Sequence, residues 1–165
     1  MRRFVAFGLI VVAIAVLQPP SGRSAAADRR QFPTFRVRDI NGNRLSPDMY
    51  RGKVVVIDFW ATWCPPCRRE MPNVVQMYRQ YHDQGLEIIG VNMDTDLNAL
   101  RSYMRTNDIE WPQYAEGNGW DNVLVDKYEV ESIPFTIVLD RQGRIYATNL
   151  RGDALKIAVR TLLAE

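Results

Sequence analysis

The chain has 165 residues, of which 47% are hydrophobic, enough for one domain with a full apolar core. Its formal net charge of +2 includes three arginines within residues 1–27, a stretch that holds no acid; removing those three from 21 basic residues leaves 18 against 19 acidic ones. This balance excludes the basic surface that is typical of nucleic-acid-binding proteins.

Residues 1–27 have the pattern of a secretory signal peptide. A charged start at Arg2 and Arg3 precedes an uncharged run over residues 4–17, and an A-x-A cleavage site ends at Ala27. We therefore expect cleavage after Ala27. The alternative is an uncleaved membrane anchor, although residues 4–17 are fewer than the roughly 20 that a spanning helix needs. Either outcome places the domain in the periplasm or otherwise outside the cytoplasm, where disulfides persist.

Residues 28–34 are polar and are predicted to form a flexible lead into a single domain over residues 35–165. The first elements of this domain are two short strands, Phe35 to Val37 and a piece near Leu45. Between them stands Asn41-Gly42-Asn43, a turn signal. The sequence therefore predicts an N-terminal β-hairpin.

Residues 54–59 form an apolar run rich in β-branched residues, which predicts a strand that is buried on both faces. A short turn follows, and a long helix is predicted to begin at Cys64. This helix is expected to bend at Pro72 and to end near Gly85. Its buried face carries apolar residues at helical spacing, namely Met71, Val74, Val75 and Tyr78.

Cys64 and Cys67 lie one turn apart at the start of this helix. Unpaired N–H groups and the helix dipole favour a thiolate there, which is the reactive form of cysteine. Cys64 is therefore the predicted nucleophile, and Cys67 is close enough to attack a mixed disulfide on Cys64 and release the product. Three other interpretations are weaker. Two Cys and one His cannot complete a zinc site alone, Arg68 stands where a haem attachment motif needs His, and so short a disulfide loop adds little stability.

The second half of the chain alternates strands and helices. A strand over residues 86–92 precedes a helix capped by Asp94 or Asp96. A segment of mixed character follows over residues 109–128, with a short helix near residues 122–128.

The last elements are a hairpin, formed by residues 135–139 and 144–148, and a final helix capped by Asp153. His82 is expected at the surface. The side chains expected in the core of this half are Leu97, Leu100, Met104, Leu155, Ala158, Val159, Leu162 and Leu163. The indoles of Trp60, Trp111 and Trp120 are also expected in the core.

The string DFWATWCPPC over residues 58–67 resembles thioredoxin. Three further strings are similar to the TlpA/ResA-like branch, which consists of extracytoplasmic thiol-disulfide oxidoreductases: WCPPCRREMP over residues 63–72, YRGK over 50–53 and SIPFTIVLDRQGRI over 132–145. The resemblance runs from about Phe35 to the C-terminus. It implies an α/β thioredoxin-like fold with a central mixed sheet flanked by helices, an N-terminal hairpin, and a TlpA-type central insertion in the mixed segment.

Two carboxylates are candidates for proton exchange with Cys67. Asp58 lies inside the apolar strand, where burial raises the pKa of a carboxyl group. It matches the buried acid of thioredoxin, whereas many TlpA-like proteins carry Asn there. Glu70 lies on the same helix face as Cys67 and matches an active-site acid of the TlpA-like motif. The alternatives are an exposed Asp58 at a strand end and a solvated Glu70 paired with Arg68 or Arg69.

The resemblance also implies a substrate-binding surface. It places a cis peptide bond at Ile133-Pro134, in a loop that faces the cysteines and whose backbone pairs with the substrate chain. Trp63 is expected on the same surface, where an aromatic face can contact a partner peptide. Pro65 and Pro66, between the cysteines, complete the expected surface.

These features predict an enzyme that carries out thiol–disulfide exchange. The reduced Cys64-Cys67 dithiol would reduce disulfides in exported proteins, and the resemblance suggests apocytochrome c first. No cofactor or metal is expected, since the electrons travel on two sulfurs, and the implied electron donor is a membrane thiol reductase. The alternatives are a thiol peroxidase of the peroxiredoxin-like type and a non-catalytic thioredoxin-fold binding module. The second cysteine argues against the peroxidase, and an intact Pro134 beside both cysteines argues against the binding module.

Overall fold

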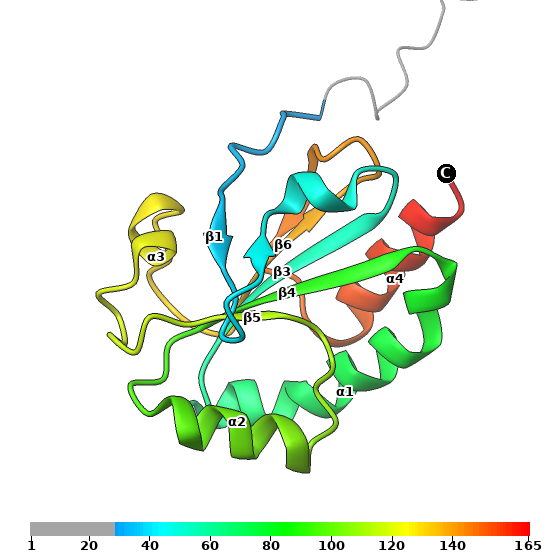
Figure 1. Ribbon diagram of the computed structural model, residues 1–165. Coiled ribbons are helices and arrows are strands. Elements are labelled where there is room, and N and C mark those ends of the chain that lie inside the picture. Colours follow the sequence, from blue (N-terminus) through cyan, green and yellow to red (C-terminus); the bar gives the residue numbers. More distant parts are fainter. Residues whose placement is uncertain (1–28) are drawn as a thin grey trace, which may run out of the picture.

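The computed structural model describes residues 29–165, and a five-stranded sheet forms the centre of the molecule (Figure 1). Its strands are β3 (Val54–Trp60), β4 (Leu86–Asn92), β5 (Gln113–Tyr114), β6 (Phe135–Leu139) and β7 (Ile145–Thr148). Their order is β5-β4-β3-β6-β7. β3, β4 and β5 run parallel, and β6 is antiparallel to both of its neighbours, so the sheet is mixed as predicted.

The signal peptide predicted over residues 1–27 lies outside the described residues. Within residues 29–165, no helix combines the length and the apolar character that a membrane crossing requires.

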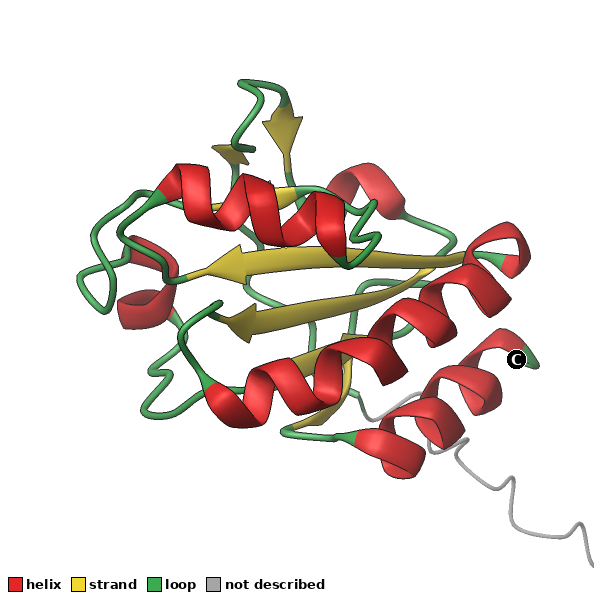
Figure 2. Ribbon diagram, turned by 90° about the horizontal axis from the view of Figure 1, so that it is seen from below, coloured by secondary structure: helices red, strands yellow, loops and turns green. Residues whose placement is uncertain are grey.

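The helices cover both faces of the sheet (Figure 2). The crossover from β3 to β4 and that from β4 to β5 move along the sheet in the same direction. Because such crossovers are right-handed, the two connecting helices share one face, and the last helix joins them there. These are α1 (Pro65–Tyr81), α2 (Leu97–Thr106) and α4 (Gly152–Leu163). The opposite face is covered by α3 (Val123–Lys127), the 3-10 helix η2 (Pro47–Tyr50) and a hairpin of β1 (Val37–Arg38) and β2 (Arg44–Leu45).

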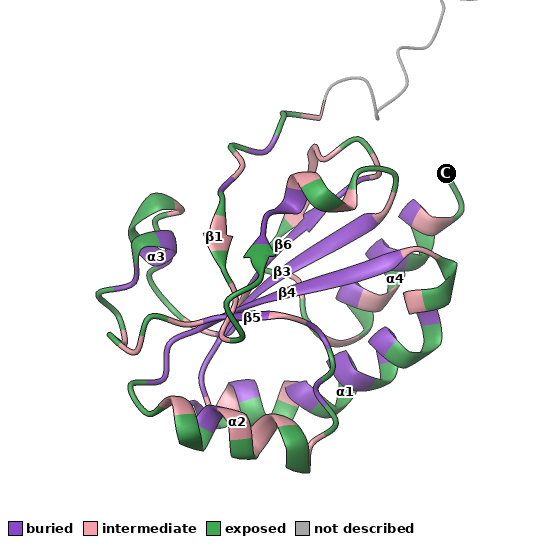
Figure 3. Ribbon diagram, viewed as in Figure 1, coloured by how far each residue is buried: buried purple, intermediate pink, exposed green. Residues whose placement is uncertain are grey.

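Consecutive side chains of β3 point to these two faces. The Trp60 ring centroid lies 5.6 Å from that of Tyr103 in α2, whereas the Phe59 centroid lies 6.3 Å from that of Tyr128, the residue after α3. Asp58 shares the face of Trp60, because side chains alternate along a strand. It therefore points toward the layer of α1, α2 and α4. Figure 3 shows the buried residues concentrated along β3 and β4 and on the inner sides of α1 and α4.

The close approach of the Gln113 side chain to β4 explains why residue 90 is a glycine. A Cβ atom at Gly90 of β4 would lie 1.9 Å from Oε1 of Gln113, so no larger residue fits there without displacing that side chain. The space allows Gln113 to reach across β4, where its Oε1 accepts a hydrogen bond of 2.9 Å from the Trp60 indole nitrogen. Trp60 is fully buried, as predicted.

The N-terminal part of the domain confirms the predicted hairpin. The hairpin forms, and its turn includes Gly42 at φ +85°, a backbone conformation that suits glycine. The segment that precedes the hairpin contacts the turn between β6 and β7. Phe32 is buried, and its N–H donates to the Gly143 carbonyl in the turn between β6 and β7.

Two predictions for the second half are wrong. Asp153 does not cap α4, because the helix begins earlier, at Gly152; the N-cap position is Arg151, whose side chain makes no cap hydrogen bond. Trp120 is 43% exposed, because it lies in the loop before α3 and not on the inner face of an element. Leu97, Met104 and Leu163, also expected in the core, are half-buried and pack against it.

Candidate functional site

The two cysteines lie at the carboxyl end of β3, where the chain turns into α1 (Figure 1). Cys64 occupies the N-cap position, and its Sγ accepts the N–H of Cys67 at 3.2 Å. A disulfide joins the pair, whose Cα atoms are 5.3 Å apart. After reduction, the same N–H and the helix dipole would stabilise a thiolate on Cys64.

The surface beside Cys64 is apolar. Cys64 itself is only 3% exposed, but Trp63 before it is 51% exposed and Pro65 after it is exposed as well. The Trp63 indole nitrogen donates to the Met93 carbonyl at 3.3 Å, which orients the ring. Pro66 is half-buried. A polypeptide that reaches Cys64 therefore meets aromatic and proline side chains next to the sulfur.

The loop before β6 faces the sulfur from the other side. The Ile133-Pro134 peptide bond is cis, which confirms the predicted isomer. The Ile133 carbonyl oxygen lies 3.8 Å from Sγ of Cys64. Cys64 is therefore held between the start of α1 and this loop, although the two segments are far apart in the sequence.

Asp58 lies beneath the site in β3 and is 4% exposed, which contradicts the alternative of an exposed strand end. Burial is the main reason why the pKa of its carboxyl group is raised to about 7, and the negative charge of Glu70 raises it further. The positive charge of Arg151 acts in the opposite direction. Near neutral pH this carboxyl group is therefore close to half-ionised, which suits both giving and accepting a proton.

Glu70 connects two helices. Its Oε1 accepts the N–H of Gly152, the first residue of α4, at 2.6 Å, and its Oε2 accepts from the Asn73 side chain at 3.3 Å. Among the ion pairs within residues 29–165, none joins Glu70 to Arg68 or Arg69, the partners in the alternative interpretation. The carboxylate thus supplies from α1 the cap that α4 lacks in its own sequence.

We expect Glu70→Ala to destabilise the protein by about 1 kcal/mol, because the Gly152 N–H then loses its acceptor. Glu70→Gln keeps an acceptor oxygen in the same position and should cost less than half as much. Urea unfolding of the two variants and the wild type measures both values. Equal losses in the two variants would show that the side-chain oxygen does not cap α4.

Asp94 is a site residue that the sequence analysis assigned to a different role. The helix cap is Asp96, whose carboxylate accepts from the first N–H groups of α2. Asp94 is buried, and it accepts from the N–H and the hydroxyl of Thr62 and from the side chain of Asn92. It therefore fixes the turn that leads into Cys64. The carboxyl ends of adjacent parallel strands lie side by side, and this proximity was the available signal.

Arg151 also contacts the site, although no motif in the sequence indicates it. Its Nη2 donates to the Pro134 carbonyl at 2.6 Å and to the Asn149 side chain at 3.1 Å. The only local signal was a basic residue near the start of the final helix, a position where the helix dipole disfavours positive charge.

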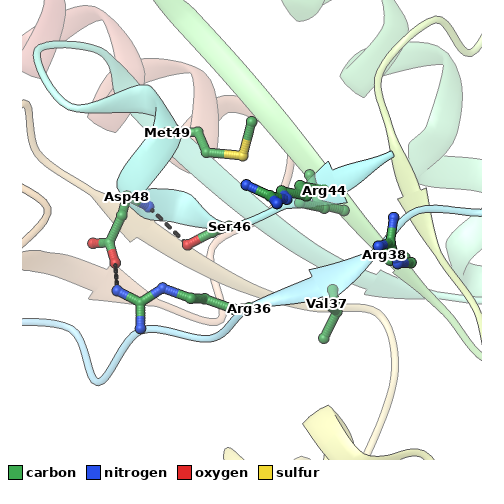
Figure 4. A pocket seen from close by; sticks show the side chains of 8 residues that line it. Arg36, Val37, Arg38, Arg44, Ser46, Asp48 and Met49 are labelled. Atoms are coloured by element: carbon green, nitrogen blue, oxygen red, sulfur yellow. Dashed lines mark hydrogen bonds and ion pairs between the residues drawn. The ribbon is translucent and has the colours of Figure 1, made fainter. Parts of the chain in front are cut away.

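Other features of the described residues lie apart from the cysteines. Within residues 29–165, no group of three or more His, Cys, Asp or Glu side chains is placed to hold a metal ion. A cavity of about 570 Å³ opens between the hairpin and η2, and it shares no residue with the site (Figure 4). Its lining includes Arg36, Arg38 and Arg44, together with Met49.

Comparison with known proteins agrees with this geometry. A family model described as thioredoxin-like matches residues 52–145. The chain is 28% identical over 150 residues to the thiol-disulfide oxidoreductase ResA of Bacillus subtilis, covering 87% of this chain and 82% of that protein. It is 32% identical over 123 residues to the ResA protein of Geobacillus kaustophilus, covering 74% and 69%.

A solved structure has the same architecture. The thioredoxin domain of a thiol-disulfide oxidoreductase from Bacteroides vulgatus superposes with a TM-score of 0.71 at 29% sequence identity. The match covers 79% of this chain and 94% of that domain.

Proposed function

The chain belongs to the thioredoxin-like family, in its TlpA/ResA-like branch of thiol-disulfide oxidoreductases, and we propose that its Cys64-Cys67 dithiol reduces disulfides of exported proteins outside the cytoplasm. The signal-like sequence of residues 1–27 supports the location. The first client that we propose is an apocytochrome c whose cysteines await haem. The proposed electron donor is a membrane thiol reductase.

The reaction consists of two exchanges. The Cys64 thiolate attacks one sulfur of a client disulfide, forms a mixed disulfide and expels the first client thiolate, which takes up a proton. Cys67 then loses its proton to Asp58 and attacks Sγ of Cys64. The second client thiolate leaves, takes up a proton, and the Cys64–Cys67 disulfide closes. Two electrons pass from the dithiol to the client disulfide.

The observation that carries this proposal is the position of Cys64. Its sulfur accepts an N–H at the start of α1 and lies 3.8 Å from the carbonyl of the cis-proline loop. An extended client segment that pairs with this loop would bring its own sulfur next to Cys64. The exposed Trp63 lies beside the path of that segment.

The carboxylates near the second cysteine support the reducing direction. Glu70 is close enough to Asp58 for its negative charge to raise the pKa of the Asp58 carboxyl group. Negative charge near Cys67 disfavours ionisation of the Cys67 thiol, and it therefore destabilises the ionised reduced form. A less stable reduced form gives up its electrons more readily.

Insulin reduction and redox equilibration against glutathione test the proposal together. We expect catalytic turnover of insulin, and a potential closer to the roughly −270 mV of thioredoxin than to the roughly −120 mV of DsbA. Absence of turnover would overturn the activity on protein disulfides. A potential near that of DsbA would overturn the reducing direction.

A further inference from the structure

The segment that leads into α4 meets the site at two consecutive residues. Arg151, at the N-cap position, donates from Nη2 to the Pro134 carbonyl at 2.6 Å. The N–H of Gly152 donates to Glu70 at 2.6 Å. Through one side chain and one backbone N–H, this short segment is therefore bound both to the loop that faces Cys64 and to the helix that carries both cysteines.

The Arg151 guanidinium is not neutralised by a direct partner. Within residues 29–165, no carboxylate lies within 4.0 Å of it, and its hydrogen-bond acceptors are a carbonyl oxygen and the Asn149 side-chain oxygen, both uncharged. Glu70, the nearby acid on α1, is bound instead to backbone and to Asn73. The positive charge of Arg151 is therefore available to act on the buried carboxyl group of Asp58.

We propose that Arg151 is a positioning residue for the exchange reaction. Its side chain fixes the cis-proline loop opposite Cys64, and its positive charge offsets the negative charge of Glu70 at Asp58. Arg151 thereby sets the pH at which Cys67 can be deprotonated. The inference rests on the proposed exchange at Cys64 and Cys67, and it adds a residue that neither the motif nor its spacing indicates.

The charges that face Asp58 come from two elements. Glu70 of α1 raises the pKa of Asp58, and Arg151 at the start of α4 lowers it. Cys67, also in α1, becomes titratable after reduction. The strand partners of Asp58 are Gly90 in β4 and Thr136 in β6, and neither carries a charge. Without Arg151, the effect of Glu70 is unopposed, and Asp58 becomes a proton acceptor only at higher pH.

The test measures the ionisation of Cys67 without any client. In a Cys64→Ala background, Cys67 is the only thiol, and its alkylation rate is recorded against pH. We expect Arg151→Gln to move the midpoint of this curve upward by roughly half a pH unit to one unit. Arg151→Lys, which keeps the charge, should stay near the parent. Arg160→Gln is the matched control, because it removes the same charge from an exposed position in the last turn of α4.

A curve for Arg151→Gln that coincides with those of Arg160→Gln and the parent would overturn the inference. An equal displacement in Arg151→Lys and Arg151→Gln would also overturn it, because loss of loop contacts alone would then account for the change. Thermal unfolding identifies any variant that fails to fold. If Arg151→Gln does so, a midpoint for Arg151→Lys that is displaced from the parent would overturn the inference. A protein that fails to reduce insulin while these curves behave as expected would refute the proposed function and leave the role of Arg151 standing.

Discussion

Replacement of Cys67 by alanine should nearly abolish turnover and leave Cys64 joined to its client. The second exchange is intramolecular in the wild type, because the attacking sulfur of Cys67 is held in the first turn of the helix that Cys64 caps. A thiol from solution has no such advantage, so we expect the mixed disulfide to resolve more than about 10³-fold more slowly. Non-reducing electrophoresis followed by mass spectrometry measures the trapped species and identifies the client.

The matched control for this trap is Cys64→Ala. Its remaining sulfur, on Cys67, is 1% exposed and lies inside the first turn of α1, whereas Cys64 lies at the N-cap next to the cis-proline loop, so we expect little trapping by this variant. Equal trapping by the two variants would reverse the roles that we assign to the cysteines. Sustained turnover by Cys67→Ala would show that the exchange does not require a resolving thiol.

The centre of the site could be predicted because its signals are local. The apolar run of β3, the prolines at the start of α1 and the spacing of Cys64 and Cys67 all lie within about 20 residues, and each favours the same strand–turn–helix unit. The buried position of Asp58 follows from the same run, since a strand covered on both faces leaves no solvent side. The resemblance added the cis bond before Pro134, which composition alone does not indicate.

The outer parts of the site depend on contacts between distant segments. Glu70 and Gly152 are 82 positions apart, and no periodicity relates them. The sequence therefore suggested Asp153 as the cap of α4, because a cap is normally sought next to its own helix. The prediction that Trp120 is buried was wrong for a related reason. Hydrophobicity predicts burial on the face of a helix or strand, but this indole lies in a loop.

A buried acid should reduce stability at alkaline pH, and Asp58→Asn should remove that effect. The pKa of Asp58 is raised by burial to about 7, compared with 3.8 for an unperturbed group. Between these values the folded protein keeps a proton that the unfolded chain has lost, so the stability present at low pH falls as pH rises toward 7. A difference of three units corresponds to roughly 4 kcal/mol as an upper bound.

We therefore expect Asp58→Asn to be more stable than the wild type by about 2–4 kcal/mol at pH 8, and to differ little from it at pH 4. Urea unfolding across this pH range measures the difference. Asp121→Asn, an exposed position in the loop before α3, is the matched control and should follow the wild-type curve. Asp58→Asn should also slow release of the mixed disulfide above pH 7, because Cys67 then loses its proton acceptor. A variant that gains no stability at pH 8 would show that Asp58 is not protonated in the fold near neutral pH, and the proton transfer assigned to it would have to belong to another group.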